Sequence, residues 1–88
     1  MYDIEIREHL DKAFRKLAKK DSLQMEAVAK KIQEIAEDPH ACKPLRFPIA
    51  GLRRVHVGSY VLLFSIDEAR KTIVLEDYDH HDRVYRSR

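Results

Sequence analysis

A short break between two β-prone runs constrains this chain more than any other feature of its sequence. From Arg54 to Val57 cationic or imidazole side chains alternate with valines, and from Tyr60 to Ile66 most side chains are apolar. The two residues Gly58-Ser59 separate the runs. Two such runs around a two-residue, glycine-containing break are typical of a β-hairpin with a type I′ or II′ turn. The sequence therefore predicts a hairpin that turns at Gly58.

This turn determines which side chains share a face of the sheet. With Gly58 and Ser59 in the turn, Val57 lies opposite Tyr60, and the pairing continues stepwise along both strands. Directly opposed residues project from the same face of a sheet. Arg54 and His56 then occupy one face, and the other carries Val55, Val57, Leu62 and Phe64. We expect one face that builds a core and one that presents cations.

The rest of the chain predicts one strand and two helices before the hairpin and one strand after it. Asp3–Arg7 alternates polar and apolar residues, which is typical of a short strand. Apolar residues then recur with helical spacing, and Asp21 opens a capping-box pattern that starts a second helix after almost no loop. Asp38-Pro39 ends that helix, because the residue before proline avoids helical geometry. Thr72–Leu75 is the last β-prone run.

This order of elements predicts an α+β fold. We expect an N-terminal strand, a helical hairpin and a three-stranded antiparallel meander, with both helices on one face of a mainly antiparallel four-stranded sheet. The 88 residues form one domain, 1–88. Charged residues make up 36% and hydrophobic ones 44%, and no apolar run reaches the ~20 residues of a membrane helix, so we expect no membrane contact. Cys42 is the one cysteine, which favours a reducing, cytoplasmic location.

Positive charge is concentrated in one segment, although the net charge is only +2. No acidic residue lies between Asp38 and Asp67, and this interval holds Lys43, Arg46, Arg53 and Arg54. Such a segment indicates an anion site, and nucleic acid is the commonest candidate. The alternative is a solvated loop and strand edge, where Lys and Arg discourage edge pairing. Charge alone leaves both readings open.

Three motifs, in order, resemble the RelE/ParE toxin superfamily. They are Lys43-Pro44-Leu45, the segment from Leu52 to Tyr60, and the closing His80-His81-Asp82-Arg83-Val84-Tyr85. The resemblance spans nearly the whole chain and implies the small RelE-like fold. It also implies a toxin of a type II toxin–antitoxin pair, held inactive in a hetero-oligomer by a cognate, RelB-like antitoxin.

The resemblance implies one of two activities. The RelE branch cleaves messenger RNA on the ribosome, and the ParE branch poisons DNA gyrase. RNA cleavage by the neighbouring 2′-hydroxyl needs proton-transfer groups and cations around the phosphorane. Clustered histidines and a cationic hairpin favour a ribosome-dependent endoribonuclease that uses no cofactor and no metal. The alternatives are a ParE-like gyrase inhibitor and a catalytically weak relative that only binds its antitoxin.

The same resemblance implies roles for individual residues. The catalytic positions are Arg54, His56, His81 and Tyr85. The RNA-binding positions are Lys43, Arg46, Arg53, His80 and Arg83. In this reading a guanidinium holds the phosphate, imidazoles bind it or shuttle a proton, and the tyrosine stacks on a base or handles a proton.

The chain departs from the family pattern at two positions. Val61 stands where arginine usually follows the hairpin tyrosine, and the usual terminal His-Arg reads His80-His81. Loss of one transition-state cation can cost orders of magnitude in rate, and the sequence leaves open whether histidines compensate. His80 and His81 are alternatively plain surface residues. A metal site there is not expected, because adjacent residues in a strand point to opposite faces.

Overall fold

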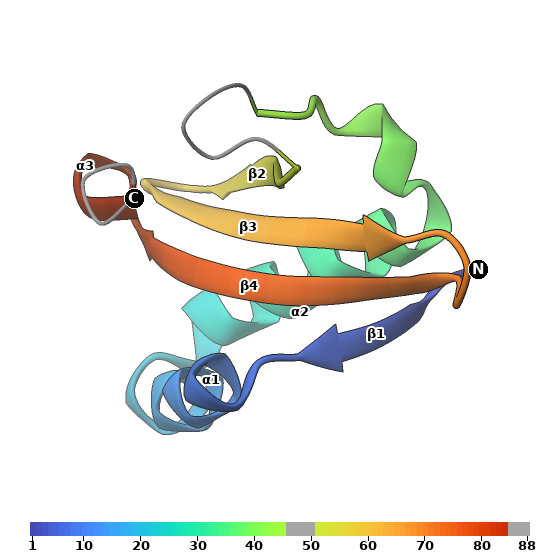
Figure 1. Ribbon diagram of the computed structural model, residues 1–88. Helices are drawn as coiled ribbons and strands as arrows, with labels where there is room; N and C mark the ends of the chain where they lie inside the picture. The colour runs from blue at the N-terminus through green and yellow to red at the C-terminus, as the bar shows by residue number, and fades with distance from the viewer. Residues whose placement is uncertain (46–50, 85–88) are drawn as a thin grey trace.

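The computed structural model describes residues 1–45 and 51–84. Within them the strands are β1 (Asp3–Ile6), β2 (Arg53–Val57), β3 (Tyr60–Asp67) and β4 (Thr72–His80). The helices are α1 (Glu8–Lys20), α2 (Ser22–Glu37), a 3-10 turn (Pro39–Ala41) and α3 (His81–Val84). The strands form one sheet in the order β1-β4-β3-β2, in which β1 is parallel to β4 and the other pairs are antiparallel (Figure 1). The predicted α+β architecture is confirmed.

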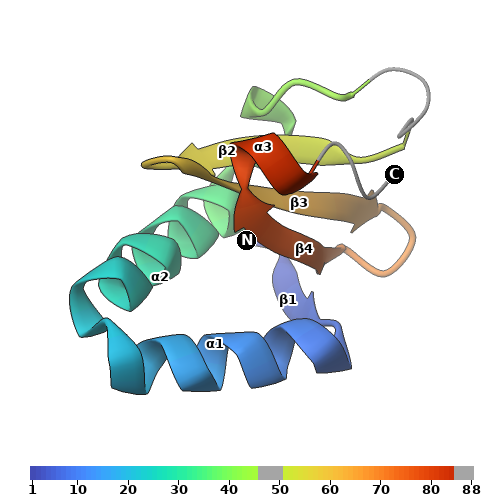
Figure 2. The same ribbon diagram turned by 90° about the vertical axis from the view of Figure 1, so that its left-hand side faces the viewer.

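The two long helices begin and end where local sequence signals require. The Asp21 carboxylate accepts a hydrogen bond from the Gln24 backbone N–H at 3.1 Å and caps the start of α2. Asp38 is the residue after the last turn of α2, directly before Pro39. Figure 2 shows α1 and α2 together on one side of the sheet, joined by a tight connection. Of the helices in the described part of the chain, none combines the length and apolar character needed to cross a membrane.

The hairpin has the register that its turn predicts. The pairs run from Val57–Tyr60 beside the turn to Arg53–Phe64 at the far end of β2. Gly58 has a φ of +64°, a conformation that glycine adopts without the strain of a side chain. The predicted assignment of residues to the two faces of this strand pair is therefore confirmed.

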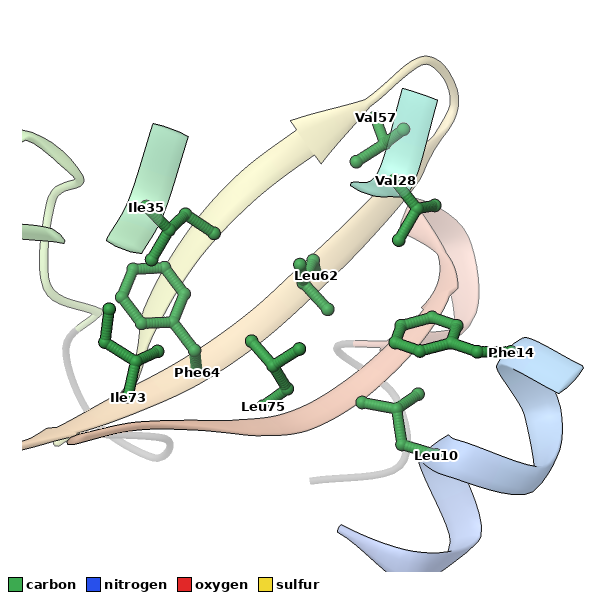
Figure 3. Close-up of a cluster of buried hydrophobic side chains, with 9 residues drawn as sticks. All are labelled: Leu10, Phe14, Val28, Ile35, Val57, Leu62, Phe64, Ile73 and Leu75. Carbon is green, nitrogen blue, oxygen red and sulfur yellow. The ribbon is translucent and has the colours of Figure 1, made fainter. Parts of the chain in front are cut away.

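The main core lies between the helices and the sheet. Leu10 and Phe14 of α1 and Val28 and Ile35 of α2 are all at most 5% exposed. They meet five buried sheet residues, Val57, Leu62, Phe64, Ile73 and Leu75. Figure 3 shows the helix side chains pointing into this layer from one side. This is the face that the sequence predicts to be apolar.

The opposite face, which we call the open face, is more apolar than the sequence analysis expected. Val61, Leu63 and Val84 are each 0% exposed and form a second cluster, with Leu45 and Leu52 packed against it. Val84 belongs to α3, an element that the sequence analysis did not predict. The cause is the central position of β3, whose run of apolar residues is buried on both faces.

Replacing Phe14 with alanine tests the main core. We expect Phe14→Ala to lower the free energy of unfolding by about 3–5 kcal/mol, since the ring is 5% exposed and its removal leaves a cavity. Urea denaturation measures the change. Leu23→Ala is the control, because Leu23 is 76% exposed on α2; its effect should stay within about 0.5 kcal/mol. Equal effects of both changes would contradict the packing described.

Candidate active site

Strand β2 places two of the predicted catalytic side chains on the open face. Arg54 pairs with Leu63 and His56 pairs with Val61 across the β2–β3 ladder. Both Arg54 and His56 are exposed. Two positions apart along one strand correspond to about 6–7 Å, so the two side chains are neighbours on this face.

A β-bulge in β4 brings carboxylates to the same face. Leu63 pairs with Asp77 but Phe64 pairs with Leu75, so Glu76 is the additional residue. As a result Asp77 and Asp79 share the open face with Arg54 and His56, on the other side of β3. The open face is therefore positive along β2 and negative along β4.

The acidic strand is partly neutralised by the segment that follows it. Arg83 forms an ion pair with Asp79, and its Nε lies 3.3 Å from Asp79 Oδ1. Arg83 and Val84 both belong to α3, and Val84 is buried against the open-face cluster. Helix α3 thus lies against the open face and carries Arg83 with it.

His81 is attached to the turn of the hairpin. Its backbone N–H donates to the Ser59 carbonyl oxygen at 3.0 Å, and its ring Nδ1 lies 3.2 Å from the same oxygen. Its Nε2 lies 3.0 Å from Asp82 Oδ1. His81 is therefore held at the turn of the hairpin, which lies beyond His56 along β2.

His80 takes a different position from its neighbour. It pairs with Tyr60, and its ring packs edge-on against the Tyr60 ring at 5.7 Å. Tyr60 in turn stacks on Tyr78 at 5.0 Å, on the face covered by the helices. Burial raises the pKa of Tyr78, whose hydroxyl accepts a hydrogen bond from Gln24 at 2.6 Å. Tyr78 is accordingly part of the packing between the helices and the sheet.

The remaining predicted site residues are divided between loop and hairpin. Lys43 is exposed, whereas Arg53 is half-buried and donates a hydrogen bond from its guanidinium to the Cys42 carbonyl oxygen. Burial raises the pKa of the Cys42 thiol, which disfavours the reactive thiolate. Arg46 and Tyr85 lie outside the described residues.

Two features of this site were missed by sequence reasoning. The first is the burial of Val61 under Val84 at the position where the family usually has arginine. The second is the β4 bulge: the acidic character of this segment is evident in the sequence, but the bulge decides that Asp77 and Asp79 take the cationic face. The signal for the second was weak, since a bulge leaves no distinctive residue in a strand of mixed acidic and aromatic groups.

A four-stranded sheet with a helical hairpin on one face and a short C-terminal helix against the other defines the RelE-type fold. The isolated Escherichia coli toxin RelE shares it with a TM-score of 0.76 and 22% identity, over 99% of this chain and 94% of that one. Residues 4–85 match the family described as ParE toxin of type II toxin-antitoxin system, parDE, and the chain belongs to this family. It is therefore a toxin of the RelE/ParE superfamily, as its motifs suggested.

Individual relatives agree with this assignment. The chain is 45% identical over 89 aligned positions to RelE4, a candidate toxin of Methanocaldococcus jannaschii, covering 100% of this chain and 95% of that protein. It is also similar to a chain in the toxin–antitoxin complex RelBE2 of Mycobacterium tuberculosis. That match has a TM-score of 0.77 and 27% identity, and covers 91% of this chain and 98% of that one.

Restoring the family's cation at Val61 should be costly. Val61→Arg puts a guanidinium into a cluster where Val61 is 0% exposed, and burying an unpaired polar group costs on the order of 1–3 kcal/mol or more. We expect urea denaturation to show a loss of at least about 2 kcal/mol. His56→Arg is the matched control, because His56 pairs with Val61 and is exposed; it should change stability by less than about 0.5 kcal/mol. Unaltered stability of Val61→Arg would contradict the second cluster.

Proposed function

We propose that this toxin is a ribosome-dependent mRNA endonuclease. The observation that carries the proposal is that Arg54 and His56 are exposed on the open face of β2, while His81 is tethered to Ser59 in the turn that ends the same strand. The name of the Methanocaldococcus jannaschii relative, RelE4, supports the RelE type of activity. A gyrase poison needs no proton-transfer groups, whereas cleavage of RNA does.

The proposed reaction needs no metal ion. The 2′-oxygen attacks the adjacent phosphorus, the P–O5′ bond breaks, and the products carry a 2′,3′-cyclic phosphate and a 5′-hydroxyl. One group accepts the 2′-hydroxyl proton and another gives a proton to the leaving 5′-oxygen. His56 and His81 are the proposed proton-transfer groups, and Arg54 stabilises the charge on the phosphorane.

Lys43, Arg46, Arg53, His80 and Arg83 remain the proposed RNA-binding residues. Tyr85 is proposed to stack on a base or handle a proton. Cations on β2 suit a phosphate backbone that approaches along this edge, because the carboxylates lie on the β4 side. His81 must exchange its contact with Asp82 for one with RNA, since its Nε2 is 3.0 Å from that carboxylate.

A cognate antitoxin is the proposed partner. The similar Mycobacterium tuberculosis structure is a toxin–antitoxin complex, RelBE2, and the archaeal RelE–RelB complex of Pyrococcus horikoshii has the same fold. We propose that a RelB-like antitoxin binds this toxin in a hetero-oligomer in the cytoplasm. Co-expression of the antitoxin should then relieve growth inhibition.

Gyrase inhibition is the second candidate function. It is favoured by the match of residues 4–85 to the ParE family, and by Val61 in place of a cation. Programmed ribosomes and DNA gyrase, each incubated with the purified chain, separate the two. Messenger cleavage supports the endonuclease. Stalled gyrase with intact messenger supports the ParE-like activity. The absence of both effects supports a relative that only binds its antitoxin.

Removal of the phosphate-binding guanidinium should abolish most cleavage. We expect Arg54→Ala to lower ribosome-dependent cleavage by ~10²–10³-fold, the scale of one electrostatic stabiliser. The rate is measured by primer extension on programmed ribosomes. Arg15→Ala is the matched control, because Arg15 is an exposed arginine on α1 that pairs with Asp11; its rate should stay within about twofold. Equal loss in both variants would mean that Arg54 acts through general RNA affinity.

Two conservative changes separate chemistry from binding. His81→Gln keeps a hydrogen-bonding side chain but cannot transfer a proton, and Tyr85→Phe keeps the ring without its hydroxyl. If these groups handle protons, both changes lower the single-turnover rate and leave the apparent affinity for ribosomes within about twofold. A loss of affinity with an unchanged single-turnover rate would assign them to RNA binding instead.

A further inference from the structure

Two imidazoles and one carboxylate converge where β4 passes into α3. The sequence analysis expected His80 and His81 to point apart, as neighbours in a strand do. Because β4 ends at His80 and α3 begins at His81, the chain turns between them, and their ring centroids lie 4.5 Å apart. The two rings therefore do not take opposite faces, and they lie close enough for one ion to contact both.

The carboxylate of Asp82 lies between the two rings. Its Oδ2 is 3.6 Å from His80 Nδ1, and its Oδ1 is 3.0 Å from His81 Nε2. One ligand atom from each of the three side chains falls within 4.8 Å of the others. Among the described residues, no second group of three histidine, cysteine or acidic side chains comes together in this way.

The geometry needs little adjustment to hold an ion. Zinc bonds of about 2.0–2.1 Å in a tetrahedron require ligand atoms about 3.4 Å apart. The three ligand atoms lie within 4.8 Å of one another, so the most distant pair has to approach by at most about 1.4 Å. The side chains of His80, His81 and Asp82 are 32%, 53% and 63% exposed, so solvent reaches all three. An ion at His80 Nδ1 would displace the hydrogen bond that this nitrogen accepts from the Asp82 backbone N–H at 3.2 Å. The backbone of these residues is held in place by the hydrogen bond from His81 to Ser59 and by the buried Val84.

We propose that His80, His81 and Asp82 bind a divalent transition-metal ion of the zinc class. Two imidazoles and a carboxylate are ligands typical of such ions, whereas Mg²⁺ and Ca²⁺ prefer all-oxygen sites. Water completes the coordination on the solvent side. This site goes beyond the proposed function, which uses no metal.

Occupation of the site has a consequence for cleavage, and this consequence rests on the proposed function. An ion bound to a ring nitrogen of His81 removes the lone pair that would accept a proton from RNA. It also occupies the solvent side of the hairpin turn. Zinc should therefore inhibit the nuclease reversibly.

A second histidine–carboxylate pair in the same protein provides a matched control. His40 Nε2 lies 3.3 Å from Glu68 Oε2, and its side chain is 50% exposed, close to the value for His81. The phenol of Tyr2 donates to Glu68 at 2.8 Å, and Lys71 lies nearby, with its Nζ 5.3 Å from the centre of the Tyr2 ring. A neutral phenol is a poor substitute for a second imidazole, so this pair should not bind zinc comparably.

The test is a titration of the whole, EDTA-treated chain with zinc chloride, followed by competition with a chromophoric chelator. We expect one ion per chain, and no competition from millimolar magnesium. His80→Gln and Asp82→Asn should each weaken zinc binding by ~10-fold or more, the usual cost of removing a group from a metal site. His40→Gln should leave the affinity unchanged, and circular dichroism verifies that every variant is folded.

Three results would overturn the site. They are absence of zinc binding to the wild type, an affinity unaffected by both His80→Gln and Asp82→Asn, and loss of binding in His40→Gln.

The inhibitory role is tested separately, in the cleavage assay. The ratio of cleavage rates with and without zinc is compared between the wild type and Asp82→Asn. Failure of the wild type to cleave without zinc refutes the proposed function and leaves the binding result standing. Equal cleavage with zinc bound refutes the inhibitory role.

Discussion

The burial of β3 on both of its faces is the constraint on which the rest of this structure depends. Four consecutive residues, 61–64, are each 0% exposed. The helical hairpin covers one side, and the other side has to be covered by α3 and by apolar residues of the preceding loop. Helix α3 packs on the sheet through Val84, and this packing places His80 and His81 beside the hairpin.

The distribution of charge follows from the strand order. Strand β2 lies at the edge of the sheet and carries Arg54 and His56 where solvent reaches them. Strand β4 lies on the far side of β3, and its bulge turns Asp77 and Asp79 to the same face. The open face is therefore positive along the edge strand β2 and negative along the inner strand β4.

The fold of this family supports the open face without selecting its target. The main core and the helical hairpin stabilise the fold, and they are compatible with a target that is either RNA or a protein. The chemistry depends on a few side chains of the open face. In this chain Val61 is part of the packing under α3, and the cationic side chains near the open face lie on β2, as Arg54, and on α3, as Arg83.

The sequence by itself determined the hairpin register, the start of α2 at Asp21 and the apolar face of the sheet. These depend on turn chemistry, capping and periodicity, which are local and leave a pattern in the chain. It could not determine the bulge at Glu76, helix α3, or the convergence of His80 with His81. Each of these depends on contacts between distant segments, such as Val84 on β3 and His81 on the Ser59 carbonyl. Only the tertiary structure decides them, because a strand with alternating acidic, aromatic and imidazole side chains satisfies either register until its neighbours are packed.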